Sequence, residues 1–567
     1  MLLKQPDSQL RWLSLSIFLL IALLSLLPST RLLIEALKGV NFSMHSPLSD
    51  ILSSSQTWTA MGHSFYTSGI GTLIAVILGA GFAFIITLTN IPRRAIWVFL
   101  FMLPMMIPPQ VSALSWLQLF GPASPILNTF GLAPALGSSN PMYSAEGIAL
   151  LLGVQNAPLV FLALRSQLLC LPQDLIEAAK IARASQLTIW LTIILPLTRS
   201  ALIAGAALAF VSSLGNFGIP AMLGIPVNYL VLPTLIYQKM AGFGQSMLGE
   251  VASLSMLISV LVLGGMVVQQ WLQQRSQYAL AGQSTQPISF RLGKWRTLTE
   301  ISIGTVLLFI LIIPCIALIV SSFVPALGMP LNSQTFTLSA YIEMLSNQGV
   351  TARAFSNSLL LAGGASIVLM VICLPLGYIL LKLPLKTRIL VTSLIEVPYA
   401  IPGIVLAIAF ILLFARPIPI LDITLYGSMS IIFLAYLSCF LSVCLKPIFS
   451  AMSQIDTALE EAAQMTGANA LQRLLHIILP LTAPAFFAGA LLVFLIAVNE
   501  LTVSALLWSA GNETLGVLIF NLDESGDTVL ASAISVLVVL LVATLMMLLS
   551  ILAPRLPKGV IPWHDSV

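Results

Sequence analysis

Charged side chains are scarce in this sequence: Asp, Glu, Lys and Arg make up only 8% of its 567 residues, whereas hydrophobic residues make up 58%. So few polar side chains could not cover a soluble particle of this size, and the composition therefore predicts a membrane protein. The net charge of +4 is small, and we take it as a signal of membrane topology rather than of nucleic-acid binding.

Cysteine and histidine are also scarce, and neither is arranged as a set of ligands. The five cysteines lie within expected membrane spans or on the inner side, so we expect no external disulfide framework. The four histidines are scattered without the spacing of metal ligands, so we expect no metal site built by the protein. These residues are Cys170, Cys315, Cys373, Cys439 and Cys444, and His45, His63, His476 and His564.

Nucleotide-binding and catalytic motifs are missing as well. The chain contains no GxxxxGK[ST] phosphate loop, and the glycine-rich run at residues 79–81 lies inside an expected span that no nucleotide could reach. No paired carboxylates, histidine boxes or nucleophile with a base stand at usable spacing. We therefore expect that the chain is no enzyme and holds no cofactor, so that ATP and Mg²⁺, if used, belong to a partner.

Long apolar runs are what the sequence has in abundance. A membrane core of roughly 30 Å requires about 20 apolar helical residues, and twelve runs meet this need. The first run follows Lys4 and Arg11, as in a cleaved signal peptide, but no small-x-small pattern follows Leu27, which favours a retained helix. The expected spans are residues 12–27, 65–88, 95–120, 148–164, 201–223 and 251–271, and then 301–323, 358–381, 389–414, 429–445, 485–508 and 529–552.

The distribution of Lys and Arg predicts the orientation, because these residues avoid the translocated side of a membrane. With the N-terminus in the cytoplasm, the twelve spans place 19 of them inside and 5 outside. A missed or spurious span would scramble this split, so we predict that both termini are cytoplasmic. The five outer residues are Arg31, Lys38, Lys239, Arg353 and Arg416.

One segment occurs twice. EAAKIARASQLTIWLTIILPL at 177–197 and EAAQMTGANALQRLLHIILPL at 461–481 share 11 of 21 residues at an offset of 284. Six expected spans in each half give the halves the same orientation, which predicts a parallel repeat with a passage at its interface. We therefore predict a first module at 1–272, a polar cytoplasmic linker at 273–297 and a second module at 298–567.

Each copy lies in an inner loop between the fourth and fifth spans of its half, at 172–197 and at 453–481. Pro172, or Ser453 and Asp456, can begin a short helix in this loop, and Gly467 can end one in a left-handed turn. Arg183 stands where Gly467 stands, and the same turn there would cost about 1 kcal/mol more. Plain amphipathic surface loops are the alternative, but the duplication favours two docking elements for a cytoplasmic protein.

Glu-Ala-Ala followed by a glycine and by Ile-x-Leu-Pro resembles the signature loop of the membrane subunits of binding-protein-dependent ABC importers. The resemblance covers almost the whole chain and implies two fused permease modules of type I in a bacterial inner membrane. It further implies two copies of a cytoplasmic ABC ATPase, each docked on one coupling helix, and a periplasmic binding protein. The implied coupling residues are Glu177, Ala178, Ala179 and Arg183, where Arg183 departs from the family glycine, and Glu461, Ala462, Ala463 and Gly467.

Few polar groups lie inside the expected spans, and these usually face a cavity or another polar group. Glu396, Asn499 and Glu500 are such groups in the second half, and Asn216 is the repeat equivalent of Glu500. We consider these four residues candidates for the substrate path, where an acidic group would favour a cation. A purely structural hydrogen bond of Glu500 to a neighbouring helix is an equal alternative.

Two further segments, GNFGIPAMLGIPVNYLVLPTLIYQ from Gly215 and NELTVSALLWSAGNETLGVLIFNL from Asn499, resemble the fused permeases of iron(III) importers. This implies ferric iron as the substrate, with thiamine or a phosphonate-type compound as alternatives. A secondary transporter driven by an ion gradient is less favoured, because loop 89–94 lacks the Asp-Arg-Gly-Arg pattern of such carriers. The outer acidic residues Asp523, Glu524 and Asp527 contact the binding protein or are simply solvated.

Overall fold

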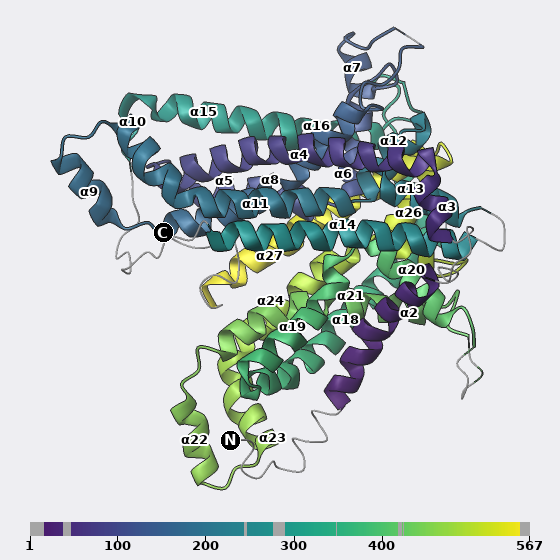
Figure 1. Cartoon of the computed structure of the whole chain (residues 1–567). Coiled ribbons are helices and arrows are strands. Elements are labelled where there is room, and N and C mark those ends of the chain that lie inside the picture. Colours follow the sequence, from purple (N-terminus) through teal and green to yellow (C-terminus); the bar gives the residue numbers. More distant parts are fainter. Residues whose placement is uncertain are drawn as a thin grey trace.

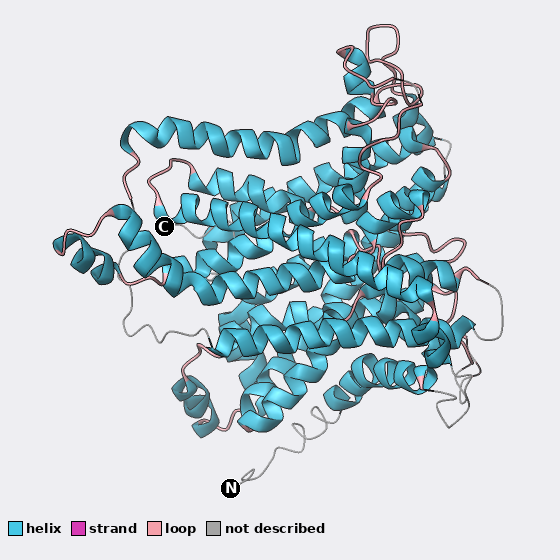
Figure 2. Ribbon diagram, turned by 45° about the horizontal axis from the view of Figure 1, so that its top comes forward, coloured by secondary structure: helices cyan, strands magenta, loops and turns pink. Residues whose placement is uncertain are grey.

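The computed structural model describes residues 16–37, 47–135, 137–242, 247–275, 290–346, 349–417, 422 and 424–555. Within these ranges the chain is helical and has no β-strand (Figure 2). Ten helices are long and apolar enough to cross a membrane, and three bent helix pairs pass the same test together. The prediction of an all-α polytopic membrane protein is confirmed. Both termini and residues 276–289 of the predicted linker lie outside the described residues.

The first module contains a nearly regular series of long helices joined by short ones (Figure 1). They are η1 (Ala22–Leu26), α2 (Leu27–Ala36), α3 (Pro47–Ser53), α4 (Ser55–Leu88), α5 (Arg94–Met106), α6 (Pro109–Leu119), α7 (Pro125–Thr129), α8 (Ala145–Leu169), α9 (Gln173–Ile181), α10 (Gln186–Ile189), η2 (Trp190–Ile194), α11 (Leu195–Gly215), α12 (Gly218–Gly224), η3 (Ile225–Val227), α13 (Leu232–Met240) and α14 (Met247–Arg275).

The second module repeats this order. Helices α4 and α18 both have 34 residues, and α9 and α22 both have 9. The elements are η4 (Gly293–Trp295), α15 (Arg296–Leu307), η5 (Leu308–Ile312), α16 (Ile313–Ser322), α17 (Ser339–Ser346), α18 (Gly349–Lys382), α19 (Leu385–Ala400), α20 (Gly403–Phe414), α21 (Met429–Met452), α22 (Thr457–Met465), α23 (Ala470–Arg473), η6 (Leu474–Ile478), α24 (Leu479–Val498), α25 (Ser504–Leu507), α26 (Leu515–Glu524), α27 (Thr528–Leu552) and η7 (Ala553–Arg555).

The third span of each module is broken. The pairs α5–α6 and α19–α20 bend by 99° and 102°. Each break follows an extended residue, Ile107 or Ile401, that precedes a proline, because the proline ring disfavours helical backbone at the residue before it. The expected spans at 95–120 and 389–414 are therefore bent helix pairs rather than continuous helices.

The expected spans at 201–223 and 485–508 are also too long. Helix α11 ends at Gly215 and α24 at Val498, and short helices in new directions follow each of them. In the first module, the segment Gly218–Val227 is bent by 72° against Leu232–Met240. These short helices bring polar residues to the ends of α11 and α24, where the modules meet.

Four spans contain a π-helical turn that ends directly before an X-Pro pair. In η1, η2, η5 and η6 the closing backbone N–H donates to the carbonyl five residues earlier. Proline lacks an N–H and its ring clashes with the carbonyl four residues before it, so the wide turn lets the helix pass the proline without breaking. The prolines are Pro28, Pro196, Pro314 and Pro480.

The first span of each module packs across the repeat. Helix α2 contacts α20 of the second module, and α16 contacts α6 of the first. In Figure 1 the purple α2 accordingly lies with the green helices, and α15 and α16 run beside α4. This exchange interlocks the modules around one continuous hydrophobic core.

Candidate coupling and translocation sites

The two repeated loops form matching helices, α9 and α22, at one end of the molecule. They lie apart from each other at the left of Figure 1. The Asp456 side chain begins α22 by accepting a 2.9 Å hydrogen bond from the N–H of Ala458, as predicted. Ser453 instead bonds back to the Ser450 carbonyl at the end of α21, and Pro172 precedes the first turn of α9 rather than lying in it.

Both helices end in the predicted left-handed turn. The φ angle is 85° at Gly467 and 56° at Arg183. The turn bonds agree, since Ala184 donates to the Ala179 carbonyl at 2.9 Å and Ala468 to the Ala463 carbonyl at 3.1 Å. Arg183 therefore has the same left-handed backbone as Gly467, its repeat equivalent. It carries the backbone strain expected there for a residue with a Cβ atom.

The faces of α9 and α22 are open to solvent. Glu177, Ala178 and Arg183 are exposed in α9 and its turn, and Ala179 is half-buried; Glu461, Ala462, Gly467 and Ala463 match them in the second copy. Two large apolar side chains at equivalent positions are also exposed, Ile181 by 84% and Met465 by 89%. A large apolar side chain is thus exposed at the same position of both helices.

A charged network attaches α22 to the transmembrane helices. Glu460 Oε1 accepts a 2.5 Å hydrogen bond from the Tyr378 hydroxyl, and Oε2 accepts one of 2.6 Å from Lys382 Nζ. Arg473 Nε lies 3.5 Å from Glu460 Oε1. Burial alone would raise the pKa of the Glu460 carboxyl, but the bonds from Lys382 and Tyr378 and the charges of Lys382 and Arg473 hold this pKa below its ordinary value. The ionised carboxylate joins α22 to α18 and α23.

The same attachment in the first module is apolar. Ile176 of α9 is buried. Leu88 and Ile189, which are equivalent to Lys382 and Arg473 of the second module, are buried too. The ring of Phe84, equivalent to Tyr378, packs edge-on against Trp190 with centroids 4.6 Å apart. The four apolar counterparts of Tyr378, Lys382, Glu460 and Arg473 are Phe84, Leu88, Ile176 and Ile189.

Two of the four residues predicted to line the passage cap helices. Asn216 Oδ1 accepts a 3.1 Å bond from the N–H of Ile219 at the start of α12. Glu500 Oε1 accepts one of 2.9 Å from the N–H of Val503 before α25, and another from the Thr502 hydroxyl. These equivalent capping bonds account for a polar residue at both positions.

The other two candidates have different surroundings. Glu396 on α19 lies 3.1 Å from Lys446 Nζ on α21, and the side chains are 46% and 61% exposed. Asn499 is nearly buried at the end of α24 and reaches the first module, with Nδ2 3.5 Å from the Met106 carbonyl and Oδ1 unpartnered. The structure thus places Asn216, Asn499 and Glu500 at the ends of α11 and α24, and Glu396 in a separate ion pair.

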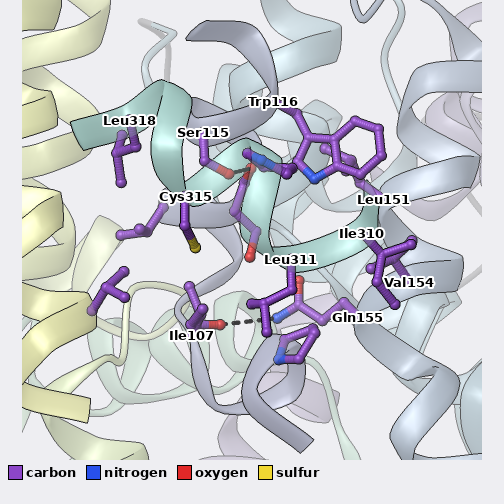
Figure 3. Close-up of a pocket in the computed structure, with 15 residues that line it drawn as sticks. Ile107, Ser115, Trp116, Leu151, Val154, Gln155, Ile310, Leu311, Cys315 and Leu318 are labelled. Atoms are coloured by element: carbon purple, nitrogen blue, oxygen red, sulfur yellow. Dashed lines mark hydrogen bonds between the residues drawn. The ribbon is translucent and has the colours of Figure 1, made fainter. Parts of the chain in front are cut away.

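Sequence reasoning missed a group of buried amides around the α5–α6 break. Gln155 of α8 donates from Nε2 to the Ile107 carbonyl at 3.5 Å. Among the residues that the structure describes, its Oε1 has no partner, and Gln110 of α6 has none at either amide atom. A cavity of about 20 Å³ next to Ile107 and Gln155 (Figure 3) has room for little more than one water molecule. The signal in the sequence was the contrast between PQVSALSWLQL in α6 and GIVLAIAFILLF in α20.

The modules meet through an aromatic cluster at the end opposite α9 and α22. The ring centroid of Phe217 lies 5.1 Å from that of Tyr237 and 6.1 Å from that of Phe520 in α26 of the second module. Beside it, burial and then Glu524 raise the pKa of Asp523 to about 6, and burial and Asp523 raise the pKa of Tyr143. Asp527 caps α27, because its Oδ1 accepts a hydrogen bond from the Leu530 N–H in the first turn of that helix.

Comparisons with known proteins agree with this architecture. The family model described as "Binding-protein-dependent transport system inner membrane component" matches residues 71–278 and 373–561. The chain is 25% identical to the "Probable ABC transporter permease protein y4fN" of Sinorhizobium fredii, over 97% of this chain and 96% of that protein. It is 24% identical to the "Ferric transport system permease protein FbpB" of Actinobacillus pleuropneumoniae, over 96% of this chain and 79% of that protein.

Among solved structures, one chain of a bacterial ABC transporter involved in the import of the polysaccharide alginate is similar. It is 16% identical with a TM-score of 0.38, covering 47% of this chain and 98% of that chain. Because the family model matches once in each half, the prediction of a fused permease with two modules is confirmed.

Proposed function

Because the chain belongs to the family of binding-protein-dependent transport system inner membrane components, we propose that it is the permease of an ATP-driven ABC importer. In this proposal a periplasmic binding protein delivers the solute at the end with the aromatic cluster, and the end with α9 and α22 faces the cytoplasm. The pair of equivalent helices with exposed Ile181 and Met465 carries the proposal, because each offers the same apolar contact to one copy of a partner.

The partners are two copies of a cytoplasmic ABC ATPase, one on α9 with Glu177, Ala178 and Ala179, and one on α22 with Glu461, Ala462 and Ala463. ATP and Mg²⁺ are held by those subunits, and both termini of the permease are cytoplasmic. The charge distribution of the loops supports this orientation, because the side with the docking helices is the one rich in Lys and Arg.

Transport follows alternating access. In the conformation described, α9 and α22 lie apart while Phe217, Tyr237 and Phe520 pack together at the opposite end (Figure 1). Closure of the ATPase pair on ATP draws α9 and α22 together, and the rigid helices they join transmit this motion to the aromatic cluster, which parts. Hydrolysis returns the permease to the state that opens toward the cytoplasm.

Ferric iron is the proposed solute, supported by the full-length similarity to a permease named for ferric transport. Thiamine and phosphonate-type compounds are the alternatives. Since Asn216 and Glu500 cap helices and Glu396 is paired with Lys446, the charge of the passage does not itself select a cation. The selection for iron then belongs to the binding protein.

Reconstitution in proteoliposomes tests the proposal. The permease, its ATPase and the binding protein loaded with radioactive ferric iron should accumulate iron when ATP is supplied on the cytoplasmic side. Uptake driven by a proton or sodium gradient without ATP would contradict an ABC importer. ATP-driven uptake of thiamine or a phosphonate, but not of iron, would retain the importer and exclude the ferric assignment.

A further inference from the structure

Gln110 is a fully buried amide without a hydrogen-bond partner. It is the second residue of α6, directly after the break, and its side chain has 0% exposure. Neither Nε2 nor Oε1 has a partner among the residues that the structure describes. Burying an unsatisfied carboxamide disfavours the folded state, so a glutamine at this position calls for a reason outside the packing of this conformation.

The amide lies in the seam between the modules. A Cβ atom built on Gly218, at the start of α12, would lie 3.4 Å from Gln110 Oε1. A Cβ atom on Gly516, in α26 of the second module, would lie 3.1 Å from Gln110 Nε2. Gln110 therefore lies between a short helix of each module, beside the cluster in which Phe217 and Phe520 meet.

A second orphaned amide comes from the other side of this seam. Asn499 of the second module donates from Nδ2 to the Leu495 carbonyl at 3.0 Å, and its Oδ1 finds no partner in the described segments. The repeat equivalents of Gln110 and Asn499 are Ile404 and Gly215, which have no polar side chain. The amides at these two positions therefore have no counterpart in the repeat.

We infer that Gln110 contacts the transported solute when the modules part, its carboxamide exchanging hydrogen bonds with the hydration shell of the solute. This inference rests on the proposed function. A neutral amide suits the task, because a passage must attract a polar solute without holding it, and a charged group at this depth would bind a polyvalent ion too tightly to release it. In the closed state the same amide is left without a partner.

Replacement of Gln110 by leucine separates this role from a structural one. We expect Gln110→Leu to keep or raise the unfolding temperature of the purified complex, while ATP-driven uptake of radioactive ferric iron from its loaded binding protein falls at least fivefold. The matched control is Gln118→Leu on the same helix, because Gln118 Oε1 accepts a 2.9 Å bond from Ser321. That variant should lower the unfolding temperature and leave uptake per folded complex unchanged.

A labelling experiment needs no solute. In a chain whose five cysteines are replaced by alanine, Gln110→Cys should react with a charged, membrane-impermeant thiol reagent when the complex is trapped with ATP and vanadate, and remain unreactive without nucleotide. Gln118→Cys should stay unreactive in both states. Absence of labelling in the trapped state overturns the inference, and so does a Gln110→Leu variant that unfolds earlier but transports normally.

The outcomes for the inference and for the proposed function are distinct. If the wild-type complex accumulates no iron, the ferric assignment fails, and labelling at Gln110→Cys still decides whether this position opens to solvent. If the wild type transports and Gln110→Leu transports equally well, the inference fails and the proposed function stands.

Discussion

Helices α4 and α8 of the first module pack backbone against backbone, whereas the equivalent helices α18 and α21 pack through side chains. Gly71, Ala75, Gly79 and Ala83 follow one another at every fourth residue of α4. A Cβ atom on Gly79 would lie 2.3 Å from the Ala157 carbonyl oxygen of α8. The repeat equivalents in α18 are Ala365, Leu369, Cys373 and Gly377.

The helices that face α4 and α18 differ in the same way. Ala149, Gly153 and Ala157 on α8 correspond to Phe433, Leu437 and Leu441 on α21. Small residues at every fourth position let two membrane helices approach closely, and this close approach supplies the packing that lipid does not. The two modules therefore keep the same arrangement of helices, although the residues that pack these helices together have diverged.

The two repeated loop helices, α9 and α22, show the same divergence. Ile176 anchors α9 among buried apolar residues, and Glu460 anchors α22 in a network with Tyr378, Lys382 and Arg473. An apolar anchor is insensitive to salt, whereas a partly exposed ion pair is screened. The two halves thus hold equivalent helices through attachments with different physical properties.

The largest expected effect is at the close contact of α4 and α8. Gly79→Leu would force the helices apart, since both the Ala157 carbonyl and the Val160 Cβ obstruct the new side chain. We expect the free energy of unfolding to fall by about 3 kcal/mol or more, and little monodisperse protein to be recovered in detergent. Cys373→Leu at the equivalent position, where a side chain already lies between α18 and the Leu441 carbonyl 3.8 Å from its Sγ, should cost less than half as much, and equal losses would contradict the difference in packing.

The next effect is at the second docking helix. Glu460→Ala leaves Lys382 and Arg473 without their carboxylate and should destabilise the α22 attachment by about 2 kcal/mol, with loss of solute-stimulated ATP hydrolysis. Amide hydrogen exchange in α22 measures the attachment. Transplanting the apolar set with Tyr378→Phe, Lys382→Leu, Glu460→Ile and Arg473→Ile should restore protection and remove its dependence on salt. A transplant as labile as Glu460→Ala would show that the two anchors are not interchangeable.

A change to the exposed face should affect both modules alike. Ile181→Asp and Met465→Asp each place a charge in the proposed ATPase contact, and we expect about a tenfold loss of stimulated ATP hydrolysis. The unfolding temperature should not change, because both side chains point into solvent. If the complex hydrolyses ATP normally with both substitutions present, these helices are not the docking elements.

A smaller effect is expected on the pH dependence of stability, at a position where the outer ends of the two modules differ. Asp523 has Lys239 as its repeat equivalent, and Lys239 lies 3.0 Å from Glu250. Because the folded protein raises the pKa of Asp523 to about 6, it binds this proton more tightly than the unfolded chain, so stability should fall as the pH rises from about 4 to about 6. Asp523→Asn should remove this dependence of stability on pH. Near neutral pH it should raise the free energy of unfolding by about 1 kcal/mol, measured by thermal unfolding. An unchanged slope would show that Asp523 is an ordinary solvated carboxylate.

The smallest effect concerns the left-handed turns. Arg183→Gly relieves a residue at φ 56° and should stabilise the end of α9 by about 1 kcal/mol, whereas Gly467→Arg should weaken α22 by a similar amount. Hydrogen exchange at Ala184 and Ala468 reports each turn separately. Equal protection in both variants and in the wild type would mean that the turns tolerate a side chain without strain.

Much of this arrangement was predictable from local sequence. Apolar length predicted the membrane helices, the duplicated loop predicted the repeat, and Gly467 predicted the left-handed turn that Arg183 also adopts. The breaks after Ile107 and Ile401 were missed although Pro108 and Pro402 are visible in the sequence. Composition measures how apolar a segment is, and it does not tell a straight span from one bent by 99°.

The candidate site was predicted less completely. Glu500 attracted attention because a carboxylate in an apolar segment is costly, but its nearest use is a capping bond to the N–H of Val503. Gln110 was overlooked because an uncharged amide does not stand out in an apolar segment as a charged residue does, and only the contrast between α6 and α20 marked it. Its importance depends on burial between two helices that are remote in the chain.

The sequence by itself determined that this is a duplicated, polytopic membrane protein with two equivalent helical loops, because apolar length, repeated residues and backbone preferences are local properties. The tertiary structure alone decided that α9 is held by apolar packing and α22 by ions, and that α2 and α16 exchange partners between modules. It also decided that Gln110 is left without a partner in the described part of the chain. These features arise where segments tens to hundreds of residues apart meet, and their free energies depend on which groups are removed from water together.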